Sequence, residues 1–117
     1  AGAAGVQVST HGGRQIDGSI SAIEALPEIV EEVGDETTVL FDSGIRRGEH
    51  AFKALALGAD SVMLGRPFVY GLAHSGQAGV EQVLRNTLSQ LDLTMGLAGI
   101  DAASDIDSEA VRDEKTL

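Results

Sequence analysis

Apolar and glycine-rich stretches follow one another along the chain and predict three strands that each end in a loop. Short runs rich in apolar and β-branched residues cover residues 5–9, 37–41 and 60–64, and a loop that contains glycine follows each run. The apolar positions within them are nearly continuous, as in parallel strands that are buried on both faces. The pattern therefore predicts a parallel sheet.

After each predicted strand, apolar residues recur at the spacing of a helix. The first helix is expected within residues 19–33, where Pro27 should interrupt or kink it. A second helix is expected from Arg47 to Leu57, and a long amphipathic one from Gly79 to Leu97. Residues 101–117 are polar and acidic, and we expect them to form a flexible tail.

Three consecutive strand–helix units predict a parallel α/β fold. An open doubly wound sheet and a (β/α)8 barrel both fit this order. Residues 2–9 line up with residues 58–65, where a helix runs into a strand, and the chain begins without methionine. We therefore expect a fragment or processed product of a longer protein. A barrel takes about 250 residues, so this chain would be three of the eight units plus a tail.

Composition limits the classes of partner. The chain has 117 residues, with 8 Lys+Arg against 18 Asp+Glu, a net charge of −10 and 3% aromatic residues. This charge repels phosphate, so we expect neither nucleic acid nor an anionic membrane as a partner, and any bound anion must be held locally. The chain has no cysteine and no cluster with metal-ligand spacing, so we expect no metal and a reducing, cytoplasmic location.

Glycine and arginine occur together in the loops after the second and third strands. In residues 42–48, glycine allows a sharp turn, the next helix offers N–H groups, and arginine adds a bidentate donor, which together suit a phosphate. An ordinary strand-to-helix turn explains this segment equally well. Residues 65–68 repeat the combination, with Pro67 starting a short helix. Two such loops on neighbouring strands favour a shared phosphate site.

The loop after the first strand, residues 9–18, carries a histidine and an arginine three residues apart. His11 could accept a proton near neutral pH, and Arg14 could hold a carboxylate. This pair suggests proton abstraction from a substrate anchored by its carboxylate. The alternative is that both side chains only hold the loop in place.

Three motifs in these loops resemble one known family. They are Ser-Thr-His-Gly-Gly-Arg-Gln-Ile-Asp-Gly at residues 9–18, Phe-Asp-Ser-Gly-Ile-Arg-Arg-Gly at 41–48 and Lys-Ala-Leu-Ala-Leu-Gly-Ala-Asp-Ser-Val-Met-Leu-Gly-Arg-Pro at 53–67. In order and spacing they resemble the FMN-dependent α-hydroxy-acid oxidising family, which includes lactate and glycolate oxidases, lactate 2-monooxygenase and flavocytochrome-type lactate dehydrogenases. The resemblance implies that residues 1–100 are the C-terminal part of a (β/α)8 TIM barrel, around strands six to eight, with residues 101–117 as the acidic tail.

The resemblance also implies roles for particular residues. His11 would be the catalytic base and Arg14 the clamp for the substrate carboxylate. The residues implied to bind FMN, through the flavin, the ribityl chain or the phosphate, are Ser9, His11, Asp42, Gly44, Arg46, Gly65 and Arg66.

The chain departs from the family pattern in two places and lacks some of its groups. Thr10 stands where the family usually has Asn, and Ser43 where it usually has Gly, which leaves the backbone at Ser43 less free. The family also uses an aspartate, a lysine and tyrosines from earlier strands. We expect these groups to come from a missing N-terminal barrel portion or a complementary chain.

The leading hypothesis is FMN-dependent oxidation of an L-2-hydroxy acid, with lactate as the first choice, to the 2-keto acid. Lactate 2-monooxygenase activity is an alternative, as is a non-catalytic half-barrel that needs a complementary chain and is inactive alone. Another phosphate-binding barrel enzyme remains open but suits the His-Gly-Gly-Arg motif less well. The family commonly forms tetramers, so we expect a homo-oligomer.

Overall fold

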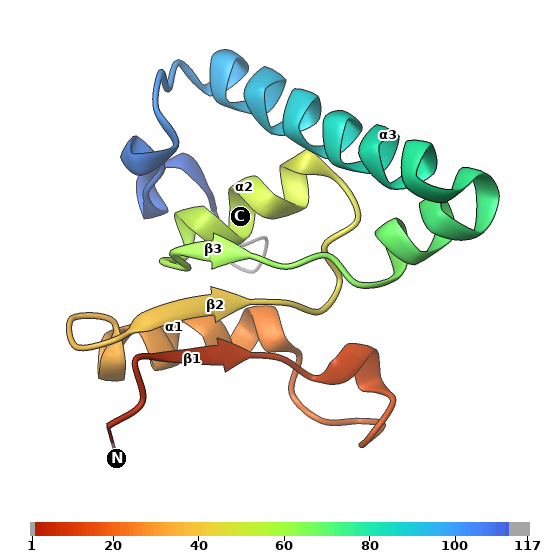
Figure 1. Ribbon diagram of the computed structural model, residues 1–117. Coiled ribbons are helices and arrows are strands. Elements are labelled where there is room, and N and C mark those ends of the chain that lie inside the picture. Colours follow the sequence, from red (N-terminus) through yellow and green to blue (C-terminus); the bar gives the residue numbers. More distant parts are fainter. Residues whose placement is uncertain (1, 113–117) are drawn as a thin grey trace.

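A computed structural model of the protein describes residues 2–112. Its sheet contains the parallel strands β1 (Gly5–Val8), β2 (Thr38–Phe41) and β3 (Ser61–Val62), in the order β1-β2-β3 (Figure 1). The register pairs Val8 with Phe41 and Phe41 with Val62, so the three carboxyl ends lie nearly level. The predicted parallel sheet is confirmed, and the three loops after it start from one edge.

Helix α1 (Ala22–Val33) packs against β1 and β2. Ser21 caps it, because its Oγ accepts a hydrogen bond from the backbone N–H of Glu24 and donates one to the Glu24 carboxylate at 2.6 Å. The expected interruption at Pro27 is wrong: the helix continues through this residue. Proline removes one backbone hydrogen bond, but the neighbouring Leu26 is completely buried, and tertiary packing of the apolar face sustains the helix.

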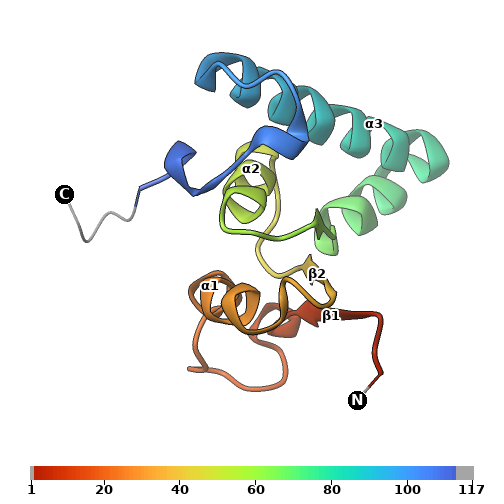
Figure 2. The ribbon, with the colours of Figure 1, turned by 90° about the vertical axis from the view of Figure 1, so that its left-hand side faces the viewer.

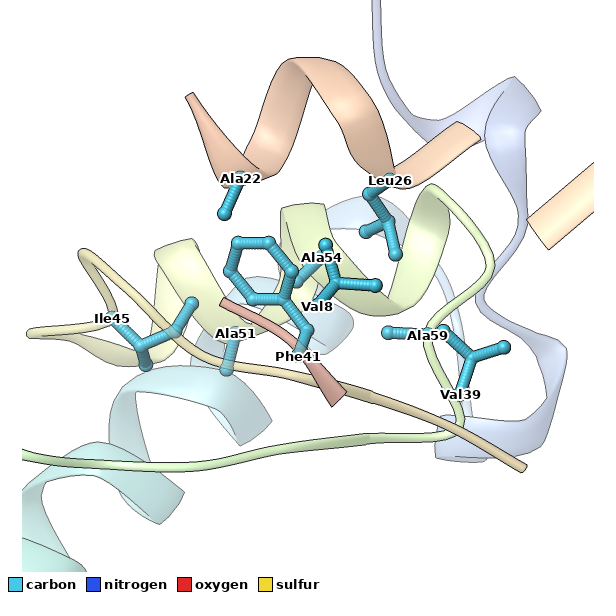
Figure 3. Close-up of a cluster of buried hydrophobic side chains, with 9 residues drawn as sticks. All are labelled: Val8, Ala22, Leu26, Val39, Phe41, Ile45, Ala51, Ala54 and Ala59. Carbon is cyan, nitrogen blue, oxygen red and sulfur yellow. The ribbon is translucent and has the colours of Figure 1, made fainter. Parts of the chain in front are cut away.

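The main core lies between the strands and the helices on one side of the sheet. Figure 3 shows Phe41 of β2 surrounded by side chains from β1, α1 and the helix α2 (Gly48–Ala56). The most deeply buried large side chains are Phe41, Leu26 and Val39. Burying each of them stabilises the fold by about 1.5–3 kcal/mol. Helices α1 and α2 cover the same face of the sheet (Figure 2), and no helix within residues 2–112 covers the other.

Helix α3 (Arg66–Ala98) is longer than the predicted helix and is broken near its start. Ser75 and Gly76 have non-helical backbone angles, so a short first segment turns back and the longer second one crosses α2 (Figure 1). At this crossing, a Cβ on Gly48 would overlap the backbone of Gln90 and Leu91. Glycine at residue 48 therefore allows the start of α2, which follows the second loop, to pack closely against α3.

Residues 101–112 belong to the acidic tail expected from the sequence. They contain two 3₁₀ turns, Ala103–Asp105 and Ser108–Ala110, and run beside α2 (Figure 2). Ile106 is only 8% exposed and joins a second core cluster with Phe52 and Met95. This apolar side chain anchors the acidic segment against α2. The rest of the expected tail, residues 113–117, lies outside the described residues.

Candidate active site

A pocket of about 340 Å³ lies at the carboxyl ends of the three strands. All three predicted loops line it. The predicted site residues among its lining are His11, Arg14, Asp42, Gly44, Arg46, Gly65 and Arg66. Ser9 does not line the pocket, but it donates a hydrogen bond to Asp42, which does. The parallel topology thus brings the separate sequence motifs into one place.

The part of the pocket best suited to an anion is the start of α3. Gly65 precedes the helix, Pro67 lies in its first turn, and no side chain caps it. The first N–H groups of a helix have no partner within the helix and carry a partial positive charge. Arg46 and Arg66 line the same pocket, and each carries a guanidinium group. Together these donors can bind a phosphate group.

The start of α2, which the sequence also suggested as a source of N–H donors, is already satisfied in part. The Gly48 N–H donates to Gln90 Oε1 of α3 at 3.0 Å, and the Arg46 N–H donates to His50 Nδ1 at 3.3 Å. The second loop therefore offers an anion the Arg46 side chain rather than these two amides. His50 therefore helps to hold the second loop in place.

The histidine loop has a left-handed backbone at three successive positions. His11, Gly12 and Gly13 form a 3₁₀ turn with φ values of +51°, +68° and +75°. A Cβ at Gly12 would lie 2.8 Å from Nη2 of Arg66. Glycine at this position therefore makes room for the arginine of the third loop. The first and third loops pack directly against each other.

Asp42, which lines the pocket, connects the first two loops. Its Oδ1 accepts hydrogen bonds from Ser9 Oγ at 2.5 Å and Ser43 Oγ at 2.8 Å, and its Oδ2 accepts one from Gln7 Nε2 at 2.7 Å. Partial burial works to raise the pKa of Asp42, but these hydrogen bonds and the nearby His11 outweigh it and lower that pKa below its ordinary value. Asp42 is therefore a carboxylate at neutral pH.

Ser43 and Gln7 are parts of this network that the sequence motifs did not identify. Ser43 drew attention only as a departure from the family pattern, and Gln7 lies on a strand with no motif of its own. The pocket also has an apolar side, which the sequence did not predict, formed by Met63, Phe68 and Val69. Phe68 directly follows Gly65–Pro67 in the sequence, and this position could have predicted that it lines the pocket.

Among residues 2–112, no group of three or more His, Asp or Glu side chains is arranged to hold a metal ion. None of the helices there combines the length and the apolar character needed to cross a membrane.

Comparison with known proteins gives closely similar relatives. A family model described as FMN-dependent dehydrogenase matches residues 1–113. The FMN-dependent alpha-hydroxy acid dehydrogenase qulF of Penicillium citrinum is 49% identical over 111 residues, which make up 95% of this chain and 28% of that protein. An L-lactate oxidase of Streptococcus iniae is 49% identical over 106 residues, or 91% of this chain and 26% of the oxidase.

The fold has equally close relatives among solved structures. The structure of an oxidized active mutant of (S)-mandelate dehydrogenase matches with a TM-score of 0.92 and 43% identity, over 97% of this chain and 31% of that one. The chain thus spans less than a third of the length of these relatives. Of the two predicted folds, the barrel is confirmed, and the three strand–helix units are part of a (β/α)8 barrel. The chain belongs to the family of FMN-dependent dehydrogenases.

Proposed function

We propose that the protein containing this chain oxidises a 2-hydroxy acid, with L-lactate as the first candidate, to the 2-keto acid with FMN as cofactor. The observation that carries the proposal is that one pocket is lined by His11 and Arg14 together with Arg46, Arg66 and the start of α3. A base, a carboxylate clamp and a phosphate site are the groups that this reaction needs. Relatives named L-lactate oxidase support the substrate class.

The residues on the anion side of the pocket fit the phosphate end of FMN. Arg46 and Arg66 supply guanidinium donors, and Gly65 leaves the chain open at the uncapped start of α3. A doubly charged phosphate is well matched by two arginines and a helix N-terminus. Asp42 is ionised and can accept one further hydrogen bond from a ribityl hydroxyl, since three of its about four acceptor positions are already taken.

The exposed His11 and Arg14 perform the substrate chemistry in this proposal. Arg14 binds the substrate carboxylate through its planar fork of donors, which fixes the orientation of the adjacent carbon. His11 accepts the hydroxyl proton while the C–H hydrogen leaves with its electron pair. FMN, when bound, supplies the acceptor for that hydride. The ionised Asp42 lies close enough to His11 for a favourable electrostatic interaction with the protonated imidazole.

The rest of the barrel completes this site. Within the described residues, β1 and β3 each pair on one edge only, and the face of the sheet opposite α1 and α2 is uncovered. The strands that close the barrel would pair with those edges. We propose that they also supply the groups expected from earlier strands.

The test is a His11→Gln variant of the full-length protein. Glutamine keeps hydrogen-bonding capacity but cannot accept the proton, so we expect turnover of L-lactate to fall by at least about 10²–10⁴-fold. The visible flavin absorption should remain. His74→Gln is the matched control, because His74 does not line the pocket, and it should keep wild-type turnover.

Two results would contradict this proposal. If His11→Gln loses flavin, the residue has a structural role. If the wild-type protein holds flavin that anaerobic L-lactate and other 2-hydroxy acids do not bleach, the proposed reaction is wrong. Analysis of the product separates simple oxidation from oxidative decarboxylation, since the first yields a 2-keto acid and the second releases CO₂.

A further inference from the structure

Ser43 has an unfavourable backbone conformation at the edge of the pocket. Its φ is +84°, and within residues 2–112 the only other non-glycine residue with a positive φ is His11. Glycine adopts this conformation freely, whereas a serine there is strained. Such strain persists where the side chain compensates for it.

The hydroxyl of Ser43 makes three hydrogen bonds that a glycine could not make. Its Oγ accepts one from the Thr10 N–H at 3.0 Å and a longer one from the Gly12 N–H at 3.4 Å, and it donates one to Asp42 at 2.8 Å. A hydroxyl has one proton and two lone pairs, so its full capacity is used. The two amides are those on either side of His11.

The His11 amide between them is held in a similar way. It donates to Ser9 Oγ at 3.1 Å, and Ser9 in turn donates to Asp42. Three successive N–H groups are thus bound by two hydroxyls, and both hydroxyls are attached to one carboxylate oxygen. The Ser9 and Ser43 oxygens themselves lie 3.5 Å apart. This network ties the first loop to the second loop across 33 residues of sequence.

We propose that Ser43 is a positioning residue that holds His11 in the geometry required for proton abstraction. The proposal rests on the proposed function of His11 as the base. The His11 side chain is exposed and is directed by its own backbone, because no hydrogen bond to the imidazole is present among the described contacts. Anchoring both flanking amides therefore sets where the imidazole lies. Without the hydroxyl, the Thr10 and Gly12 amides lose this acceptor, and the Ser9 hydroxyl is left to link the His11 amide to Asp42.

Two substitutions in the full-length holoenzyme separate this role from a purely structural one. Ser43→Gly removes the hydroxyl and relieves the backbone strain, whereas Ser43→Ala removes the hydroxyl and keeps the strain. If the hydroxyl positions His11, both variants should lose about 10- to 100-fold in kcat, with flavin content and KM near the wild-type values. Ser89→Ala, an exposed serine on α3, is the control and should match the wild type.

A second readout does not depend on activity. Hydrogen–deuterium exchange of peptides spanning residues 9–13, measured by mass spectrometry, should be faster in both Ser43 variants, because the Thr10 and Gly12 amides have lost their acceptor. Should Ser43→Gly keep the wild-type kcat and exchange rate, the proposal is overturned, even if Ser43→Ala fails to fold. Failure of the wild-type enzyme to oxidise a 2-hydroxy acid would instead refute the proposed function. In that case, faster exchange in the Ser43 variants would still show that the Ser43 hydroxyl holds the first loop. Unchanged exchange would show that it does not.

Discussion

Replacing Gly12 by alanine tests how the first and third loops are fitted together. Gly12 has φ +68°, and a Cβ there would lie 2.8 Å from Nη2 of Arg66. Gly13 has a similar φ of +75°, but a Cβ there would meet no atom within 4 Å. The pair Gly12→Ala and Gly13→Ala therefore shares the same backbone strain and differs only in the clash with the guanidinium.

The expected magnitudes follow from these contacts. A left-handed backbone costs an alanine about 1–2 kcal/mol, so both variants should be destabilised to a similar extent. The guanidinium is the far end of a flexible side chain, so in Gly12→Ala it should swing aside rather than disrupt the fold. Loss of one hydrogen bond to a charged phosphate costs about 1.5–3 kcal/mol. The FMN dissociation constant of Gly12→Ala should therefore rise about 10- to 100-fold above that of Gly13→Ala.

The assay is FMN binding to the full-length apoprotein, followed by quenching of flavin fluorescence, together with urea unfolding of each variant. The difference in FMN affinity between the two variants is the decisive quantity, because it cancels the shared strain. Equal dissociation constants for Gly12→Ala and Gly13→Ala would refute the role of Arg66 at the phosphate. A large loss of stability in Gly12→Ala alone would show that the clash is absorbed by the backbone instead.

Two further predictions concern stability. Leu26 is completely buried, so Leu26→Ala should lower the free energy of unfolding by about 2–5 kcal/mol. The control Glu32→Ala, on the exposed side of α1, should change it by less than about 0.5 kcal/mol. Equal effects of the two substitutions in urea unfolding would contradict the core described above. The pKa of Asp42 is lower in the folded protein than in the unfolded chain, so its stabilising contribution is complete above the unfolded pKa of about 3.9 and is lost as pH falls through the folded value. Asp42→Asn should therefore flatten the fall in stability as the pH drops below the unfolded pKa, and an unchanged slope would show that the network does not perturb this carboxyl.

Many of the residues that line the pocket were predictable from sequence because each motif lies directly after a strand. In a parallel sheet the carboxyl ends of neighbouring strands meet at one edge, so short motifs far apart in sequence converge without any knowledge of side-chain contacts. His11, Arg14 and Arg66 reach the pocket for this reason. The glycines at residues 12 and 44 were likewise identified by type, and both have positive φ.

The tertiary structure decided which partners these groups have. Gln90 accepts a hydrogen bond from the Gly48 amide, 42 residues away in the sequence. Ser43 accepts hydrogen bonds from two amides of the first loop, 31 and 33 residues earlier in the sequence. The packing of α1 against the sheet sustains a helix through Pro27 that local propensity would break, and Ile106 docks a segment whose composition suggests flexibility.

By itself, the sequence determined the three strand–helix units, the glycine and arginine loops and the residues available for chemistry, because periodicity and turn preferences are local properties of the chain. Only the tertiary structure decided which N–H groups remain open to an anion and how His11 is held, because hydrogen-bond partners distant in sequence are chosen by the packing of whole elements.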